Sequence, residues 1–319
     1  MSRFVTLGET MGLIRSERIG HLGNNAPMVA GMGGAESNAA IALARLGNEV
    51  SWVGKVGDDD FGRLITRELR AENVQTFGLL GRGATGLMVK TTPLNGLQDV
   101  VYSRSLSAGS ELSNCDISDD VIAAADVLHL TGITLALSDS ARQAAFHAVE
   151  VARAAGVKVS FDVNYRAKMW SVDDAHRACS ELAAQADIVF AGFDEVRLLL
   201  GDDVTIGPDE VASALPRIVD LGAQTPVVKE GTLGSWSLSG GTVVHVPAVV
   251  VPSVDTVGAG DGFAAGFLDA LSRGAGIDEA LELGARVGAF ACLTPGDWEG
   301  YPTPEQLKLL DGGGDTVTR

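Results

Sequence analysis

Short apolar segments alternate with longer amphipathic segments along most of the chain. The apolar segments are rich in β-branched residues and almost continuously hydrophobic, as is typical of strands that are buried on both faces. They cover residues 4–9, 49–57, 126–133, 158–164, 187–192 and 225–231. Segments with helical periodicity lie between them, at 36–46, 61–72, 140–155, 173–186 and 210–221. This repeated strand–helix order predicts an α/β fold with a doubly wound, mainly parallel sheet and helices on both faces.

Some strand-like segments have no helix between them. They are MGLIRS and APMVAGMG near the start of the chain, and GLMVKTTP and DVVYSRS further on. We expect these segments to form a small β-sheet lid over one end of the main layer, with strands contributed from about 10–33 and 86–106. The chain ends in the glycine-rich, polar segment 311–319, which predicts a flexible tail after one domain spanning residues 1–310.

The overall charge excludes several classes of partner. The chain has 319 residues, of which 46% are hydrophobic, and a formal net charge of −17, so nucleic acids and anionic membranes are disfavoured as partners.

Its three cysteines are widely spaced and form no CxxC motif, which is typical of reduced thiols. The chain shows neither a signal peptide nor an apolar run of membrane-spanning length, and we therefore expect a cytoplasmic protein.

The segment DTVGAGDGFAAGF, residues 255–267, gathers glycines around a single carboxylate, Asp261. Phe263, Phe267 and Leu271 follow at a spacing of four, which predicts a helix that begins within the glycine cluster. Unpaired N–H groups and the helix dipole favour an anion at such a terminus, and glycine lets the backbone approach it closely. The same dipole should favour the ionised form of Asp261.

The glycine cluster matches neither of the widespread phosphate-binding motifs. GxxxxGK[ST] does not occur, and GAGDGF lacks the final glycine of GxGxxG and lies near the C-terminus. Close packing of two helices is an alternative reason for the small residues. The ionisable Asp261 within the cluster favours a ligand site, because a merely packed helix start has no use for a carboxylate.

Two long motifs carry a family resemblance. DTVGAGDGFAAGFL resembles the C-terminal signature of the ribokinase-like (PfkB) carbohydrate kinases, and GMGGAESNAAIALARLGNEVSWVGKVG resembles their upstream signature, with Gly33, Gly34, Asn38, Gly47 and Gly57 at the family spacing. The resemblance covers almost the whole chain and implies a ribokinase-like fold with a β lid. It also implies transfer of the γ-phosphoryl group of ATP to a sugar hydroxyl, with Mg²⁺.

The resemblance assigns roles to individual residues. Asp261 would be the catalytic base, which accepts the proton of the attacking hydroxyl. Gly258, Ala259 and Gly260 would form the anion hole. The nucleotide would contact Lys229, Gly231, Gly258 and Gly260. Asp255 would either serve a monovalent-cation site, such as one for K⁺, or cap the turn.

The family motif that organises Mg²⁺ is altered in this chain. The family often carries NxxE, whereas the corresponding segment here is GFDEVRLLLG, in which Gly192 replaces the asparagine. Glu195 keeps the acidic position and is the candidate to organise Mg²⁺ through water.

Further segments resemble the 2-keto-3-deoxygluconate kinases within this family: VVYSRSLSAGSEL, LHLTGITLAL, SFDVNYRAKMW and PGDWEGYPT. The segment LGETMGLI after the first strand has no aspartate of the kind with which many neutral-sugar kinases bind sugar hydroxyls. By this resemblance a substrate carboxylate would meet Arg104 and Arg166, because a guanidinium group matches a carboxylate well. The other implied sugar contacts are Gly33, Gly34, Asn38, Tyr102, Ile133 and Asp297.

The expected reaction is phosphorylation of 2-keto-3-deoxygluconate to 2-keto-3-deoxy-6-phosphogluconate. Kinases of a neutral ketose such as fructose, or of 5-dehydro-2-deoxygluconate, are alternatives, and a non-catalytic sugar sensor is a third. The retained Asp261 argues against a sensor. The partners would be the sugar acid and ATP, and a lid with an apolar face would pair with a second subunit in a homo-oligomer.

Overall fold

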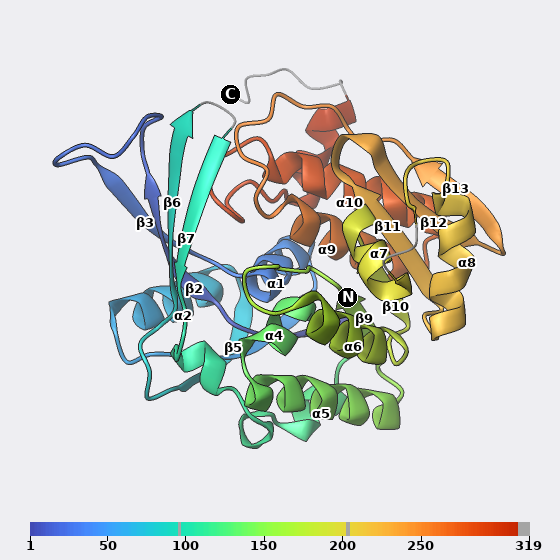
Figure 1. Ribbon diagram of the computed structural model, residues 1–319, viewed down its shortest axis with the longest axis horizontal. Helices are drawn as coiled ribbons and strands as arrows, with labels where there is room; N and C mark the ends of the chain where they lie inside the picture. The colour runs from blue at the N-terminus through green and yellow to red at the C-terminus, as the bar shows by residue number, and fades with distance from the viewer. Residues whose placement is uncertain (95–96, 202–204, 312–319) are drawn as a thin grey trace.

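The computed structural model describes residues 1–94, 97–201 and 205–311, so the predicted tail lies outside the described residues from position 312 onward. Within these ranges, two sheets organise the chain (Figure 1). The main sheet has nine strands in the order β13-β12-β11-β10-β9-β8-β1-β4-β5. Its strands pair in parallel except β12 and β13, which extend one edge in antiparallel pairing.

The main-sheet strands agree with the apolar segments in the sequence, with three additions, β5, β12 and β13. Their bounds are β1 (Arg3–Leu7), β4 (Glu49–Val56), β5 (Val74–Leu80), β8 (Val127–Thr131), β9 (Lys158–Asp162), β10 (Ile188–Ala191), β11 (Thr225–Glu230), β12 (Gly234–Ser239) and β13 (Thr242–Val246).

Helices cover both faces of the sheet. One face packs against α1 (Ala35–Arg45), α2 (Asp60–Ala71), α9 (Ala259–Ser272) and α10 (Ile277–Ala291). The other packs against α5 (Asp139–Ala155), α6 (Val172–Ala183), α7 (Phe193–Leu200) and α8 (Val211–Leu221). Shorter helices are α3 (Asp119–Ala123), α4 (Gly132–Leu137) and α11 (Pro304–Leu307). The prediction of a doubly wound sheet is confirmed.

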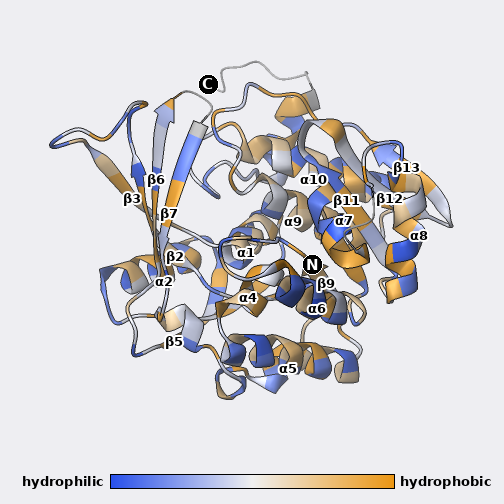
Figure 2. Ribbon diagram, in the orientation of Figure 1, coloured by the Kyte–Doolittle hydropathy of each residue, from blue (hydrophilic) through white to orange (hydrophobic). Residues whose placement is uncertain are grey.

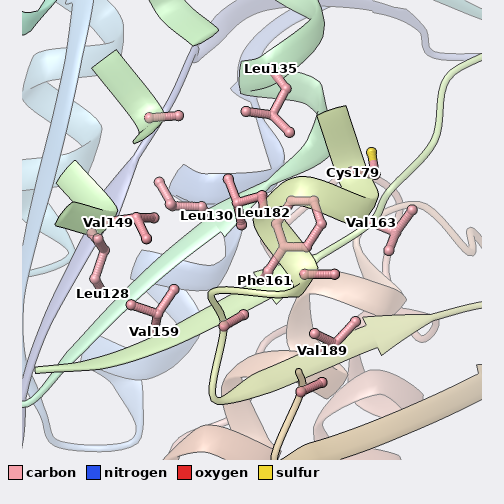
Figure 3. Packing of buried hydrophobic residues seen from close by; sticks show 14 of the residues in the cluster. Leu128, Leu130, Leu135, Val149, Val159, Phe161, Val163, Cys179, Leu182 and Val189 are labelled. Atoms are coloured by element: carbon pink, nitrogen blue, oxygen red, sulfur yellow. The ribbon is translucent and has the colours of Figure 1, made fainter. Parts of the chain in front are cut away.

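The outer helices, such as α5 and α6, turn an apolar face toward the sheet and a polar face outward (Figure 2), whereas α9 is buried on all sides over residues 262–270. In α5 the buried stripe consists mainly of alanines, which lets the helix approach the sheet closely. Ser138 caps the start of α5 by accepting the N–H of Ala141, and Gly156 ends it with φ 74°. Beneath α5 and α6, side chains from three neighbouring strands and both helices interlock, among them Leu128, Val159, Phe161, Leu182 and Val189 (Figure 3).

The lid is a separate four-stranded sheet that stands beside the main body, at the left of Figure 1. It contains β2 (Met11–Ser16), β3 (Met28–Gly33), β6 (Leu87–Leu94) and β7 (Leu97–Ser103), in the order β3-β2-β6-β7. Strands β2 and β6 run parallel, and the two outer pairs are antiparallel. Leu13 and Met88 are paired neighbours on its buried face. The lid strands thus come from the two regions that the sequence indicated.

Within the described residues, no helix combines the length and the hydrophobicity that a membrane crossing requires.

Candidate active site

A cavity of about 1600 Å³ lies where the carboxyl ends of the parallel strands face the inner side of the lid. The segments that follow β1, β8, β9, β10 and β11 all contribute to its wall, as do β2, β6 and β7 of the lid. Ligands of open α/β sheets bind at this end of the strands. All the residues that the sequence analysis assigned to the site line this cavity except Gly33 and Asp255, which lie directly behind its wall.

The first turn of α9 presents Asp261 to the middle of the cavity. Asn38 of α1 donates a hydrogen bond from Nδ2 to Oδ2 of Asp261, at 2.8 Å, and thereby fixes the carboxylate. The two signature motifs, far apart in the sequence, therefore meet at this side chain. The backbone before it turns through Gly258, which has φ 79° and ψ −10° and precedes the first helical residue, Ala259.

The pKa of Asp261 differs from the sequence-based expectation. The helix N-terminus predicted a carboxylate that ionises easily, but burial raises the pKa of Asp261 to about 6 despite the Asn38 hydrogen bond and the nearby positive charge of Lys229. Desolvation penalises the charged form more strongly than these partners favour it. The prediction was wrong in direction because burial cannot be read from the helix position alone. A carboxylate with this pKa can still accept a proton at neutral pH.

Gly258 has a structural reason to be glycine. Its φ lies in the left-handed region, and a Cβ atom at this position would overlap the carbonyl oxygen of Asp297. Tyr301 donates a hydrogen bond from its hydroxyl group to the carbonyl oxygen of Gly258, at 2.8 Å. Tyr301 follows Asp297 in the sequence, so the segment that carries Asp297 also holds the turn at Gly258 in place.

Lys229, at the end of β11, borders the same turn. Its Nζ lies 3.0 Å from the position that a Cβ on Gly260 would occupy, and it donates to Oδ2 of Asp162 at 2.6 Å. Burial lowers the pKa of Lys229, but the carboxylates of Asp162 and Glu195 more than offset this and raise it above its usual value. A charged ammonium group therefore stands beside the N-terminus of α9. Gly231 lies in the exposed segment that follows, with φ 42°.

Glu195 lies in the first turn of α7 and is held by backbone groups. Its Oε1 accepts the N–H of Tyr165 at 2.8 Å, and its Oε2 accepts the N–H of Gly192 at 2.7 Å. Burial and the neighbouring Asp162 raise the pKa of Glu195. Oδ1 of Asp162 is buried and has no hydrogen-bond partner among the described residues.

Arg104, which directly follows β7 of the lid and lines the cavity, is paired with a residue that was not predicted from the sequence to belong to the site. Glu9, which follows β1 and is fully buried, contacts Nε and Nη2 of Arg104 at 2.8 and 2.5 Å. Ser107 also donates to Glu9, and the guanidinium group lies over the ring of Tyr102, at 5.8 Å from its centroid. Arg104 is therefore fixed in place, with its charge balanced by Glu9.

Arg166 differs from Arg104 in its surroundings. It follows β9, is exposed, and has no ion-pair partner within the ranges that the structure describes. Its positive charge reaches far enough to lower the pKa of Asp261. Arg166 is thus the arginine of this pair whose charge remains available to a ligand.

Asp297 lies in the loop after α10 and lines the cavity. Burial raises the pKa of Asp297 to about 7, although the ammonium group of Lys90 opposes this. A Cβ on Gly33 would overlap the carboxyl group of Asp297, and one on Gly34 would overlap the carbonyl oxygen of Glu9. The paired glycines of the upstream signature therefore allow the lid, α1 and this loop to meet.

Asp255 is surrounded by partners from the protein. Lys90 of β6 donates to its Oδ2 at 2.5 Å and Gln98 of β7 donates to its Oδ1 at 2.7 Å. The N–H groups of Val257 and Gly296 also point to this carboxylate, at 3.1 and 3.3 Å. Of the two roles expected for Asp255, the contact with Val257 is that of a turn cap.

Three residues at the site were not predicted from the sequence: Glu9, Lys90 and Asp162. Glu9 and Asp162 could have been found, because each is an acidic residue at the carboxyl end of a predicted parallel strand. Lys90 lies in the middle of a strand, and only its position inside the buried face of the lid distinguishes it.

The chain is similar to known carbohydrate kinases over nearly its whole length. The model of the pfkB family of carbohydrate kinases matches residues 1–304. A 2-dehydro-3-deoxygluconokinase of Bacillus subtilis is 35% identical, covering 95% of this chain and 93% of that protein. The enzyme of the same name from Thermoproteus tenax is 33% identical, covering 97% and 94%. A 2-dehydro-3-deoxygalactonokinase of Haloferax volcanii is 31% identical, covering 98% of both. More distant matches include a probable fructokinase-5 from Arabidopsis thaliana and a 5-dehydro-2-deoxygluconokinase from Shouchella clausii.

Solved structures agree with the fold. A PfkB protein from Polaromonas sp. JS666 superposes with a TM-score of 0.84 at 34% identity, covering 97% of this chain and 99% of that one. An E. coli protein assigned as Ribokinase II, crystallised with ATP and Mg²⁺, superposes with a TM-score of 0.87 at 25% identity, covering 98% and 99%. The match of the family model to almost the entire chain, together with the meeting of both signature motifs at Asp261, shows that this protein belongs to the pfkB family of carbohydrate kinases.

Proposed function

We propose that this kinase phosphorylates the terminal hydroxyl of a small sugar acid, and that its substrate is 2-dehydro-3-deoxygluconate, also called 2-keto-3-deoxygluconate. The product would be the 6-phosphate. The observation that carries the proposal is Arg166, which faces the same cavity as Asp261 and has no ion-pair partner among the described residues. The names of the similar kinases from B. subtilis and T. tenax support the same substrate.

The charges at the sugar end favour a carboxylate. Arg104 is balanced by Glu9, so the positive charge left for a ligand comes from Arg166. A neutral ketose would leave this guanidinium group without a charged partner. In our proposal Arg104 and Tyr102 form a fixed wall of the sugar pocket. Asp297 accepts a hydrogen bond from a sugar hydroxyl, and Gly33 leaves room for its carboxyl group. The pocket is further shaped by Gly34, Asn38 and Ile133.

The other end of the cavity fits ATP. A site for one drug-sized ligand typically has roughly 300–1,000 Å³, and this cavity, at about 1600 Å³, has room for a nucleotide beside a sugar. The N-terminus of α9 and Lys229 would bind the phosphates, and Gly231 would lie along the nucleotide.

The residues also fit Mg²⁺ held mainly through water. Among the described residues, no group of three or more His, Cys, Asp or Glu side chains forms a ready-made metal site. Mg²⁺ usually keeps several waters and binds one or two carboxylates together with substrate phosphates. The unpartnered Oδ1 of Asp162 and the nearby Glu195 are the groups that would hold it, and the ion would neutralise phosphate charge. A Cβ added to Gly192 would make ordinary van der Waals contacts with Glu195, Glu230 and the carbonyl oxygen of Lys229, all at 3.6 Å, so glycine is not sterically required there.

In the reaction, Asp261 would accept the proton of the sugar hydroxyl as that oxygen attacks the γ-phosphorus of ATP. The Asn38 amide would hold the carboxylate in place during this step. N–H groups at Gly260 and Asp261 would bind the charge that develops on the transferred group, whereas the N–H of Ala259 already donates to the carbonyl oxygen of Thr256 at 3.3 Å. Lys229 would add a positive charge on the same side.

An ATP-consumption assay with purified protein tests the substrate. The panel contains 2-dehydro-3-deoxygluconate, its galactonate epimer, 5-dehydro-2-deoxygluconate and fructose, and ³¹P NMR identifies the phosphorylated position. We expect the highest kcat/KM with 2-dehydro-3-deoxygluconate and a 6-phosphate product. A preference for fructose would refute the sugar-acid assignment, and absence of turnover with every sugar would favour a sensor.

We also propose that the protein is cytoplasmic and that it forms a homo-oligomer through the lid. Ile14, Val89 and Val101 pair across neighbouring strands on the face of the lid opposite Met88, and Val101 is 62% exposed. A second copy would bury this apolar row. Light scattering at micromolar concentration should show a dimer or larger species; a strict monomer would contradict the proposal.

A further inference from the structure

Lys90 joins the lid to the main body inside the protein. The side chain is buried, with 5% of its surface exposed, and its Nζ lies 2.5 Å from Oδ2 of Asp255 and 3.7 Å from Oδ1 of Asp297. Lys90 belongs to β6 of the lid, whereas Asp255 precedes α9 and Asp297 lies in the loop after α10. A long, flexible side chain in a buried position is rarely retained without paired charges.

Asp255 links three parts of the site. It accepts hydrogen bonds from the lid through Lys90 and Gln98. It accepts the N–H of Val257, directly before the left-handed turn at Gly258. It also accepts the N–H of Gly296, the neighbour of Asp297. The position of the lid is thus connected to the backbone turn at the anion hole and to the carboxylate proposed to bind the sugar.

Lys90 also brings positive charge to a group of acids. Asp255, Asp261 and Glu299 act on Asp297 by charge repulsion and raise its pKa, and Lys90 opposes this effect. If the lysine charge were removed, Asp255 would remain buried without a counter-charge, and a small cation from solution could relieve it.

We propose that Lys90 is a positioning residue for phosphoryl transfer, whose ammonium group holds the lid and the turn before α9 together and makes a monovalent cation from solution unnecessary at Asp255. This inference rests on the carbohydrate kinase activity but not on which sugar is the substrate. It takes the place of the K⁺ site that was one of the two roles expected for Asp255.

The test compares potassium chloride with choline chloride at equal ionic strength. Wild-type protein should show the same kcat/KM and the same unfolding temperature in both salts. Lys90→Met should lose between about 10- and 100-fold in kcat/KM in choline chloride, because a misplaced site costs on this order. Potassium or ammonium chloride should restore several-fold of that loss and raise the unfolding temperature of the variant.

Lys55→Met is the matched control. Lys55 forms a less deeply buried ion pair with Asp116, at 2.7 Å and with 14% and 12% of the two side chains exposed, and does not line the cavity. The Lys55→Met variant should have a lower unfolding temperature than the wild type, and potassium should change neither its kcat/KM nor its unfolding temperature. Activation of the wild-type protein by potassium, or an equal response of the two methionine variants, would overturn the proposal.

Further measurements keep the test decisive. If Lys90→Met does not fold, the double variant Lys90→Met/Asp255→Asn removes both charges, and we expect it to fold and to ignore potassium. A potassium response in this double variant would count against the proposal. The unfolding temperatures need no substrate, so the inference can be judged even if the sugar-acid assignment fails in the panel assay.

Discussion

Replacing Asp261 with asparagine should lower activity and raise stability at the same time. The variant keeps the shape of the side chain and the contact with Asn38, but an amide cannot accept the proton of the sugar hydroxyl. We therefore expect kcat to fall by at least ~10²-fold, the usual effect of losing a general base. Nucleotide affinity should change little, because the turn before α9 would bind the phosphates through its backbone, as proposed above.

The stability gain follows from the pKa of the carboxylate. Burial raises the pKa of Asp261 from 3.8 to about 6, which corresponds to about 3 kcal/mol against the ionised form at neutral pH. Because the side chain is only partly buried, we expect asparagine to recover roughly 1–3 kcal/mol of unfolding free energy at pH 7.5. An acid whose pKa is raised in the folded state destabilises the fold when it ionises. The loss of unfolding free energy therefore grows as the pH rises from 3.8 to about 6, and it is absent below that interval.

Two measurements on wild type and Asp261→Asn check this reasoning. Steady-state kinetics between pH 5 and pH 8 should show the wild-type kcat/KM rising about tenfold as a group with a pKa near 6 ionises, and the variant should lack that rise. Urea unfolding at pH 7.5 should show the variant to be more stable. A variant that is less stable and only slightly less active would show that Asp261 is a structural residue.

Two further substitutions test neighbouring parts of the site. Arg166→Ala should reduce kcat/KM for 2-dehydro-3-deoxygluconate by roughly 10- to 150-fold, the loss of one charge-assisted hydrogen bond of about 1.5–3 kcal/mol, mainly through KM. Its kcat/KM for fructose should barely change, and equal losses would make Arg166 structural. Gly258→Ala should abolish activity, because its Cβ would overlap the backbone of Asp297 at φ 79°. The control is Gly274→Ala, at φ 84° with open space around it, which should lower only the unfolding free energy, on the order of 1 kcal/mol. Full activity of Gly258→Ala would contradict the role given to this turn.

The periodicity of the chain was sufficient to predict the main sheet and most of its helices. Continuous apolar strands such as β8 are buried on both faces, so their pattern carries a strong signal. The two edge strands of the sheet, β5 and β13, were not predicted, because their patterns carry a weak signal. β5 leaves Phe77, Leu79 and Leu80 exposed, and β13 mixes exposed and half-buried residues, so neither shows the pattern of a buried strand.

The site was predictable where the family motifs mark it, as at Asp261 and Asn38, and not where it depends on isolated polar residues. Lys90 belongs to no motif and acquires its role from Asp255, a partner distant in sequence, whereas Glu9 was recognisable as an acidic residue at the carboxyl end of a predicted strand. The raised pKa of Asp261 shows the same limit, since the helix terminus is visible in the sequence whereas the desolvation that outweighs it is not.

A matched pair of substrates tests the central claim most directly. 2-Dehydro-3-deoxygluconate and 3-deoxyfructose differ only at the first carbon, which is a carboxylate in the acid and a hydroxymethyl group in the ketose. If Arg166 binds the carboxylate while Asp261 activates the hydroxyl at the other end, wild-type kcat/KM should favour the acid by at least about tenfold, the effect of one charge-assisted contact. Equal kcat/KM values, or a preference for the ketose, would contradict the account.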